Sequence, residues 1–476
     1  MLEPALAQLP EPSAKDTAVE DAVSAGPPRS AADAAEPPDA AAEAEEGAAA
    51  PAAADEAPAD PLLAAPPATE HPPAPDSLFS PLEAKIELER LVADERYEEA
   101  VPVGERLVEL TDQEFGAVSR EAAEARMALA RVQSQAGRHE AAETTYLAAI
   151  DIVREVDGMF SPLAIEPLTG LGDNYQEAGQ YLNAVSAYTE ARTVSRRVYG
   201  LLNEGQIPIM DRLTATLQSL EQPLEADRMQ LEALRIVERT HEPHSPEALA
   251  AIYKYARWLR DNGRYQEERD QYNRAIRIIR DHYGDDSVRL ARPLSAIGNS
   301  FRHQRLPEGQ GAESLQEALE LLRASQPVDR LALAEVLRDI GDWSVAFSKV
   351  PYDGAEYKRA WQLLGEVEGG EEIRRRWFTG PEYVLREPIS QRGLSNDPDA
   401  LPGHVLVRFD LDETGETENV AVVESEPPGF KDEAVLRAVR RSRFRPQMVD
   451  GQIVPGRGLA LRFTYRYKLD EEGDDE

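Results

Sequence analysis

A repeat of 42 residues runs through the middle of the chain and limits the folds that it can adopt. Its columns include Ala100, Ala142, Ala184 and Ala226; Ala149, Ala191, Ala233 and Ala275; and Leu110, Ile152, Val194, Ile236 and Ile278. Several independent columns that share one long period indicate a solenoid of stacked supersecondary units. Further on, Ile340-Gly341 lies 43 residues after Ile297-Gly298, which fits an insertion in the intervening loop.

Each repeat contains two helical patterns separated by a short turn. Three of these turns read Ala136-Gly137-Arg138-His139, Ala178-Gly179-Gln180-Tyr181 and Asn262-Gly263-Arg264-Tyr265. Small residues in fixed columns allow two helices to pack closely, and the large aliphatic columns fill the space between them. We predict about seven helical hairpins between Pro81 and Gly365, with atypical first and last units that cap the solenoid.

This pattern resembles the tetratricopeptide repeat in its longer variant, as in kinesin light chains. The resemblance implies a superhelical scaffold that binds proteins or peptides and does not catalyse. Its concave face would be lined by residues from the first helix of each hairpin. The candidates are Arg126, Gln133, Asn174, Lys254, Arg257, Asn299 and Arg302. A solvated helix face is the alternative interpretation for each of them.

The hydrophobic period changes near the end of the chain from helical to alternating. In the segment that begins at His404, Val405, Val407, Phe409 and Leu411 share one face, which predicts a half-buried strand. The elements that follow are a turn at Asp412-Glu413-Thr414-Gly415, a strand over Val420–Glu424, an amphipathic helix over Lys431–Ser442 and a closing strand over Leu459–Tyr467. The order β-β-α-β predicts a small α+β domain with one helix on a sheet.

These residues also carry a resemblance to a known family. The pattern G-x-V-x-V-x-F-x-L-D-x-x-G, then V-V-x-S-x-P-x-G-F, F-R-P, D-G and a closing aromatic strand is similar to the C-terminal domain of the TonB family. The resemblance implies a periplasmic domain of bacterial envelope proteins. Such a domain takes up a short extended peptide, the TonB box of an outer-membrane transporter, as an additional strand.

By this resemblance, the last strand is the edge that receives the peptide. It comprises Leu459, Ala460, Leu461, Arg462, Phe463, Thr464, Tyr465, Arg466 and Tyr467. Edge strands present unpaired N–H and C=O groups that an extended peptide can bond. Nearby arginines are Arg440, Arg441, Arg443 and Arg445. One interpretation is a basic surface that binds either an acidic peptide or the acidic tails of this chain. The other is that these arginines are only the solvated face of a small domain.

Composition excludes several classes of function. The formal charge of −36 disfavours binding of the whole molecule to nucleic acid or anionic lipid. No run of apolar residues is long enough to span a bilayer. The chain contains no cysteine, which excludes disulfides, thiolate zinc sites and thiol catalysis.

The sequence offers no catalytic or cofactor motif. It contains no glycine-rich phosphate loop, no G-x-S-x-G and no H-E-x-x-H. His241 and His244 are three residues apart, but no third ligand accompanies them, so we do not predict a metal site. We therefore expect a protein that is not an enzyme and that has no cofactor.

The N-terminal segment is rich in Ala, Pro, Asp and Glu, and Lys15 and Arg29 are its only lysine and arginine. This composition predicts a disordered linker. Ala5-Leu6-Ala7 before Gln8 has the form of a signal-peptidase site, so we expect a start upstream of this chain. The predicted boundaries are a linker at 1–77, a solenoid at 78–366, a junction at 367–379, a TonB-like domain at 380–469 and an acidic tail at 470–476.

Two functional hypotheses follow. In the first, the chain is a periplasmic adaptor for transport across the envelope: its last domain binds an outer-membrane TonB-dependent transporter, and its solenoid binds a second protein or peptide. Family transducers carry an N-terminal transmembrane helix that this chain lacks, so we do not expect it to transmit force from the inner membrane. In the second, it is a structural scaffold without a role in TonB-dependent transport, with the last domain packed on the solenoid or self-associated through its edge.

Overall fold

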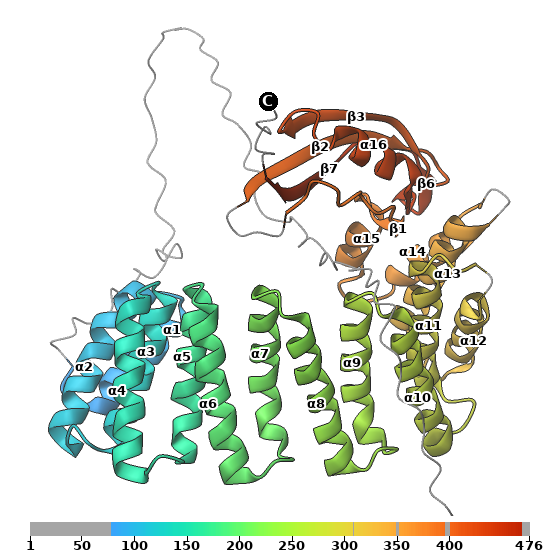
Figure 1. Cartoon of the computed structure of the whole chain (residues 1–476). Helices are drawn as coiled ribbons and strands as arrows, with labels where there is room; N and C mark the ends of the chain where they lie inside the picture. Colours follow the sequence, from blue (N-terminus) through green and yellow to red (C-terminus); the bar gives the residue numbers. More distant parts are fainter. Residues whose placement is uncertain (1–77, 308, 349–351, 396–399, 469–476) are drawn as a thin grey trace, which may run out of the picture.

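The structure is a computed structural model that describes residues 78–307, 309–348, 352–395 and 400–468. The linker and the acidic tail expected at 1–77 and 470–476 lie outside the described residues. The described part is a superhelical solenoid of helices with a small sheet domain placed over one end of it (Figure 1). The mostly helical fold with a C-terminal α+β domain, which the sequence predicts, is therefore confirmed.

The solenoid is built from seven successive helical hairpins. They are α1 (Pro81–Ala93) and α2 (Tyr97–Phe115); α3 (Arg120–Gln135) and α4 (His139–Asp157); α5 (Ile165–Glu177) and α6 (Tyr181–Tyr199); α7 (Ile207–Ser219) and α8 (Pro223–His241); α9 (Leu249–Asp261) and α10 (Tyr265–Tyr283); α11 (Ala291–His303) and α12 (Gly311–Ala324); and α13 (Arg330–Phe347) and α14 (Ala355–Leu364). Single 3₁₀ turns, η2 (Pro162–Ala164), η3 (Glu204–Gln206), η4 (Pro246–Ala248) and η5 (Val288–Leu290), precede α5, α7, α9 and α11. The helix α15 (Gly370–Phe378) follows the last hairpin.

The repeat columns have clear structural roles. The alanines at 100, 142, 184 and 226 are all 0% exposed and lie where the two helices of a hairpin meet. The turn between the helices requires a positive φ at one position, which we call the turn column. Its members and their φ angles are Glu95 (58°), Gly137 (72°), Gly179 (73°), Glu221 (56°), Gly263 (72°) and Arg305 (58°). Glycine adopts this conformation without strain, whereas Glu and Arg adopt it at a cost.

One residue departs from the buried alanine column. Glu268 occupies the next position of that column, 42 residues after Ala226, and is 1% exposed. No described residue bonds its Oε2 atom. Burial raises the pKa of the Glu268 carboxyl to about 7, because the charged form loses its water.

The C-terminal domain is built on a three-stranded antiparallel sheet. Its elements are β1 (Tyr383–Leu385), β2 (Leu401–Leu411), β3 (Thr417–Glu426), α16 (Asp432–Arg441), β4 (Arg443–Phe444), β5 (Gln447–Val449), β6 (Gln452–Val454) and β7 (Gly456–Tyr467). The main sheet has the order β3-β2-β7, and small two-stranded sheets pair β1 with β4 and β5 with β6. The predicted face of β2 (Val405, Val407, Phe409 and Leu411) is 0% exposed and packs with Val435 and Val439 of α16.

The junction predicted between the two parts is helical. Within residues 367–379, α15 begins after Gly369, whose φ of 71° turns the chain into the helix. Trp377 and Phe378 at its other end are buried in the same hydrophobic cluster as Leu337 and Tyr357 of the last hairpin. Glycine and charge made this segment resemble a linker, but its two aromatic residues join it to the solenoid.

A buried ion pair joins the C-terminal domain to the solenoid. Arg445 donates from Nε to Oδ1 of Asp342 (2.9 Å) and from Nη2 to Oδ2 (2.8 Å), and the side chains are 9% and 2% exposed. Tyr357 donates its hydroxyl to the same carboxylate (2.9 Å). Burial alone raises the pKa of Asp342, but the charge of Arg445, its hydrogen bonds and the nearby Arg302 outweigh burial and hold this pKa well below its usual range.

Further contacts from the C-terminal domain surround this pair. Met448 of β5 is 1% exposed and belongs to the hydrophobic cluster of the solenoid, and Ile453 of β6 packs against it. Arg302 of α11 donates to the carbonyl of Val384 (2.5 Å), and Arg445 donates to the carbonyl of Trp377 (3.0 Å). The β5–β6 hairpin is therefore part of the core of the last repeats.

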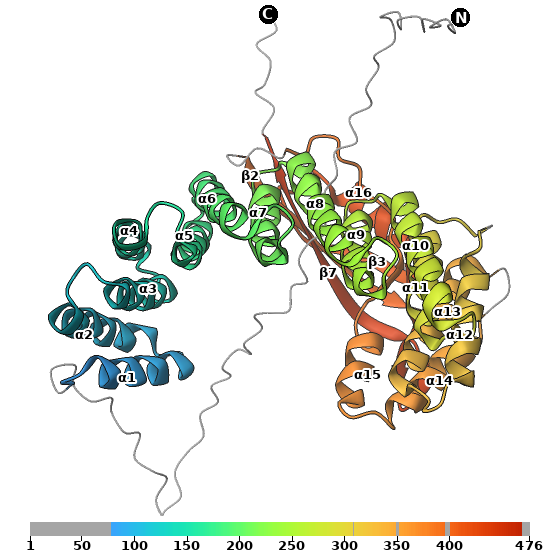
Figure 2. The same ribbon diagram turned by 90° about the horizontal axis from the view of Figure 1, so that it is seen from below.

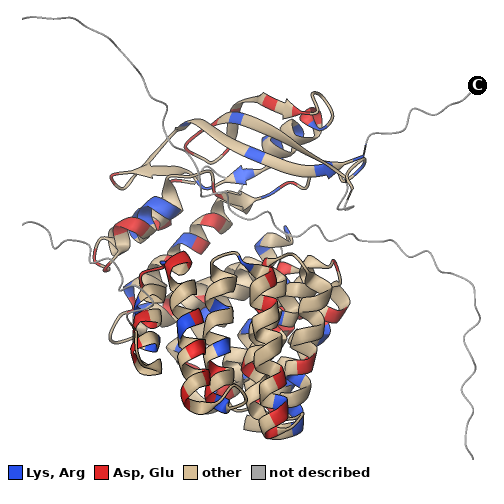
Figure 3. Ribbon diagram, turned by 90° about the vertical axis from the view of Figure 1, so that its left-hand side faces the viewer, with Lys and Arg blue, Asp and Glu red and all other residues tan. Residues whose placement is uncertain are grey.

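The anchored domain extends from the last repeats over the ends of the helices towards the middle hairpins (Figure 1). Viewed from below, β2 and β7 run from the region of α15 towards α7 (Figure 2). Acidic and basic residues are interspersed over both parts (Figure 3). The end of the sheet opposite the anchor therefore lies near the middle hairpins.

We expect Arg445→Ala to lower the free energy of unfolding of the last repeats and the C-terminal domain by about 3–5 kcal/mol, because it leaves Asp342 charged and buried. Denaturant unfolding of the full chain measures this. Arg443→Ala is the matched control, since Arg443 pairs with Glu416 (2.7 Å) through side chains that are 38% and 56% exposed and a partly exposed pair contributes about 0–1 kcal/mol. Equal losses in the two variants would contradict the role assigned to the buried pair.

A second prediction concerns pH. The pKa of Glu268 is about 7 in the folded chain, and the ordinary value is 4.5. The folded state therefore binds the proton more tightly than the unfolded state does. As a result, the free energy of unfolding of the wild type falls as the pH rises from 4.5 to about 7. We expect Glu268→Gln to be more stable than wild type by about 1–3 kcal/mol at pH 8, with the difference shrinking towards pH 4.

Urea unfolding at a series of pH values tests this prediction. Glu267→Gln is the control, because the hydrogen bond from Arg264 lowers the pKa of the Glu267 carboxyl, so removal of its charge is expected to reduce stability at pH 8. A Glu268→Gln difference that does not change with pH would show that the buried carboxyl does not titrate in this range.

Candidate functional site

The strand β7 leaves one edge of the main sheet open. The carbonyl of Arg466 accepts a hydrogen bond from the Ser395 N–H (2.9 Å) on the side away from β2. Because main-chain groups alternate in direction along an antiparallel strand, those of Ala460, Arg462 and Thr464 also point away from β2. Within the described ranges, no residue bonds these three N–H and three C=O groups.

The side chains of β7 alternate in the same way. Those of Leu459, Leu461, Phe463 and Tyr465 pack against the core of the domain, whereas Ala460, Arg462, Thr464 and Arg466 are exposed on the opposite side, which we call the outer face. Tyr467 is buried, 8% exposed, near the point where Leu394 pairs with it. The nine residues named from the sequence therefore form one strand with a packed face and an outer face.

The other edge of the sheet, on β3, is less regular. Its pairing with β2 shifts register twice, between Leu406 and Val407 and between Arg408 and Asp410. Asn419 in β3 has a φ of 52°, which interrupts the extended backbone. Bulges of this kind twist an edge away from an incoming strand. By contrast, the pairing of β7 with β2 is continuous from Leu459 to Tyr467, so β7 is the better template.

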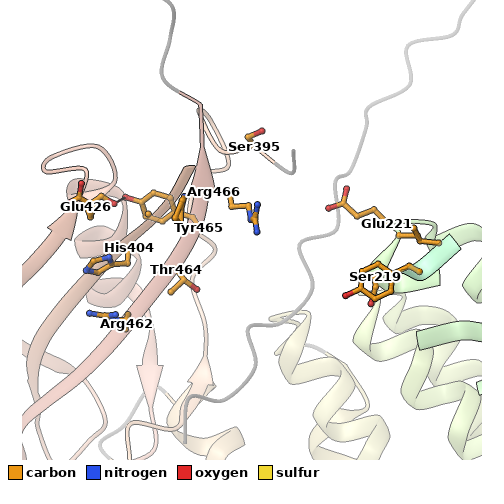
Figure 4. Close-up of a pocket in the computed structure, with 13 residues that line it drawn as sticks. Ser219, Glu221, Ser395, His404, Glu426, Arg462, Thr464, Tyr465 and Arg466 are labelled. Carbon is orange, nitrogen blue, oxygen red and sulfur yellow. Dashed lines mark hydrogen bonds between the residues drawn. The ribbon is translucent and has the colours of Figure 1, made fainter. Parts of the chain in front are cut away.

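A cleft of about 1180 Å³ lies between β7 and the turn that joins α7 to α8. The solenoid side is lined by Tyr181, Ser219, Leu220 and Glu221, and the sheet side by residues that include His404, Arg462, Thr464, Tyr465 and Arg466. In the close-up, the side chains of Glu221 and Arg466 point towards each other across the cleft (Figure 4). The solenoid wall therefore carries the acidic Glu221, and the sheet wall carries Arg462 and Arg466 together with the acidic Glu426.

The arginines predicted to lie near the edge are placed elsewhere. Arg440 donates to the carbonyl of Val420 on β3 (3.5 Å), and Arg443 pairs with Glu416 at the β2–β3 turn. Arg441 faces Glu387 (3.8 Å). Since β2 separates β3 from β7, these residues do not border the open edge. Placing Arg445 on a basic surface was wrong, because it is buried in the ion pair with Asp342.

The candidates for the concave face of the solenoid also divide into groups. Gln133, Asn174 and Arg302 are 6%, 1% and 6% exposed, so they belong to the packed interior. Arg126, Lys254 and Asn299 bond acidic neighbours, and Arg257 is exposed. Asn299 also lines a groove of about 700 Å³ formed mainly by α9, α11 and α13.

His241, one of the two histidines considered for a metal site, is exposed and contacts Glu204 (2.6 Å).

Two features of the site were not identified from the sequence. The partners Asp342 and Arg445 are 103 residues apart, and no pattern relates them. Glu221 could have been recognised from the sequence, because it occupies the turn column 42 residues after Gly179 and 42 residues before Gly263. A charged residue where the repeat favours glycine therefore pointed to this turn, as it also did to those of Glu95 and Arg305.

Two protein-family models match the chain. The model of the Gram-negative bacterial TonB protein C-terminal domain matches residues 399–467, and the tetratricopeptide repeat model matches residues 91–155 and 206–281. Both are modules of protein–protein interaction. No curated protein matches the chain. None of the helices in the described ranges combines the length and apolar character needed to cross a membrane.

Solved structures similar to the solenoid include a putative kinesin light chain from Podosopora anserina with nearly identical TPR-like repeats (18% identity, 44% of this chain and 99% of that chain, TM-score 0.36). Another is BtubC (BKLC) from P. vanneervenii (19% identity, 50% of this chain and 88% of that chain, TM-score 0.34). A third is the C-terminal part of a TPR repeat-containing protein from Cytophaga hutchinsonii (11% identity, 60% of this chain and 97% of that chain, TM-score 0.35). They show a likeness of fold alone.

The open edge predicts an alternating pattern of amide hydrogen exchange along β7. We expect the amides of Ala460, Arg462 and Thr464 to exchange fast, because they have no acceptor, and those of Leu461 and Phe463 to exchange slowly, because they bond β2. Residue-resolved exchange on the full chain measures this. Gly458 is the internal control: its N–H points outward but donates to Asp410 Oδ1 (2.8 Å), so it is protected. Uniform protection along β7 would show that the edge is covered.

Proposed function

We propose that this chain, which combines tetratricopeptide repeats with a TonB C-terminal domain, is a non-enzymatic protein–protein interaction adaptor of the bacterial cell envelope. Its C-terminal domain binds an extended peptide, the TonB box of an outer-membrane transporter, as a fourth strand beside β7. The solenoid binds a second protein or peptide. The observation that carries this proposal is the unpaired main chain of Ala460, Arg462 and Thr464 on the regular edge of the sheet.

Strand addition suits this edge energetically. Each of the three outward residues offers one donor and one acceptor, so a guest strand gains up to six main-chain hydrogen bonds. A net contribution of about 0.5–1.5 kcal/mol for each bond gives useful affinity without any particular guest sequence. Side chains of the guest beside Arg462 and Thr464 on the outer face then provide the selectivity.

The anchor to the solenoid supports this function. The Asp342–Arg445 pair and the buried Met448 hold the domain in one orientation, so the edge does not have to be ordered when a guest arrives. The domain packs on the last repeats through β1, β4, β5 and β6, and this packing leaves β7 open. Binding of a guest and attachment to the solenoid are therefore compatible.

The family description supports a location in the periplasm and an outer-membrane transporter as the partner. We also propose 78–366 as the solenoid and 380–469 as the TonB-like domain, with α15 connecting them. The groove that Asn299 lines is a candidate site for the second partner. The alternative function is a scaffold in which the C-terminal domain only stabilises the end of the solenoid, and the extensive anchor is the observation that favours it.

We expect Arg462→Pro to weaken binding of TonB-box peptides by about tenfold or more, because proline removes an outward N–H and its ring obstructs the guest strand. Proline is tolerated on an edge strand where the N–H does not pair within the sheet, so the domain should remain folded. Fluorescence polarisation with labelled synthetic TonB-box peptides and the full chain measures the affinity.

Arg462→Ala is the matched control, since it removes the same side chain and keeps the N–H. We expect it to change the affinity by less than about fivefold, as for an exposed charge. Equal affinities for wild type and Arg462→Pro would exclude strand addition at β7. An absence of binding by every such peptide to the wild-type chain would favour the scaffold instead.

A further inference from the structure

Two members of the turn column lie where the solenoid faces the C-terminal domain. Three of its six members are glycines, and two of the three others, Glu221 and Arg305, lie at this boundary. Arg305 bonds Glu387 (2.6 Å) and the carbonyl of Arg386 (2.7 Å) in the segment that follows β1. A side chain at positive φ carries a conformational cost, and at Arg305 these contacts offset it.

For Arg305 such contacts are present, and for Glu221 they are missing. Glu221 is exposed, it lines the cleft opposite β7, and no described residue pairs with its carboxylate. In Figure 4 its side chain extends into the cleft towards Arg466. A strained, unpaired carboxylate that faces the open edge is consistent with a ligand that enters between the two walls.

We infer that the α7–α8 turn is the second wall of the peptide site and that Glu221 selects the peptide. This inference rests on the proposed strand addition at β7. A guest strand continues the sheet, so every second guest side chain lies on the outer face with Arg462 and Thr464. The cleft opens from this face towards Tyr181, Ser219 and Glu221. The solenoid therefore contacts the same peptide that β7 holds.

Arg462 on the sheet wall and Glu221 on the solenoid wall indicate the class of peptide, and Glu426 adds an acidic group to the sheet wall. Arg462 has only a long contact with Glu424 (3.5 Å), with both side chains 53% exposed, and is available to a guest carboxylate. Glu221 offers the opposite charge to a guest lysine or arginine. We therefore expect an extended peptide with an acidic and a basic residue on the same face.

The test replaces Glu221 with glycine in the full chain. Glu221→Gly removes the carboxylate and restores the residue that the turn prefers, so the variant is expected to fold at least as well as wild type. Glu95→Gly is the matched control: it makes the same change in the same column, at an exposed residue of the first hairpin that does not line the cleft. The probes are the labelled TonB-box peptides described above, each also made with its basic residues changed singly to alanine.

We expect Glu221→Gly to weaken binding by about two- to fivefold and Glu95→Gly to leave it unchanged. In the Glu221→Gly chain, replacing the basic residue of the peptide should cause no further loss, because its partner is already gone. Equal binding by wild type and Glu221→Gly, with binding still lost in Arg462→Pro, would overturn this inference and leave the proposed function intact. An absence of binding by the wild-type chain would overturn both.

Discussion

The buried pair of Asp342 and Arg445 is the interaction on which the arrangement of this protein depends. Each partner is unfavourable alone at such depth, and only the other makes its burial tolerable. Apolar contacts at Met448 and Ile453 add buried surface area, but such contacts are compatible with many relative orientations of the two parts. The bidentate hydrogen bonds between a guanidinium and a carboxylate form in only a few orientations. The orientation of the whole C-terminal sheet relative to the solenoid follows from this one contact and its neighbours.

Fixing the orientation gives the open edge its surroundings. On a freely hinged domain, β7 would meet any peptide in bulk water, and its selectivity would come from the sheet alone. Held over the solenoid, the same edge faces the α7–α8 turn across a cleft. In the proposed peptide site, the repeats and the sheet would contact one ligand together.

The sequence predicts the features that are periodic and local. The 42-residue columns identify the hairpins, and alternation identifies β2 and β7, because each buried face imposes its own period on the residues that form it. The strands β4, β5 and β6 have two or three residues each, which is too short for any period to appear. The ion pair and the cleft arise from residues far apart in the chain, and opposite charges in a chain with 29% charged residues are too common to indicate a pair. The fourth turn was an exception, since Glu221 breaks a visible column.

The hairpin β5–β6, which places Met448 among the side chains of the last repeats, has a consequence for how the molecule comes apart. In a solenoid each unit is stabilised only by its neighbours, so unfolding can begin at an end and spread. Here the C-terminal end of the solenoid packs against the core of the C-terminal domain. Unfolding of either part therefore exposes apolar surface of the other. The last three hairpins and the β5–β6 hairpin share one hydrophobic cluster, so we expect them to unfold as one cooperative unit, whereas the first hairpins belong to other clusters. A fragment cut between solenoid and sheet would divide that unit and leave apolar surface on both halves.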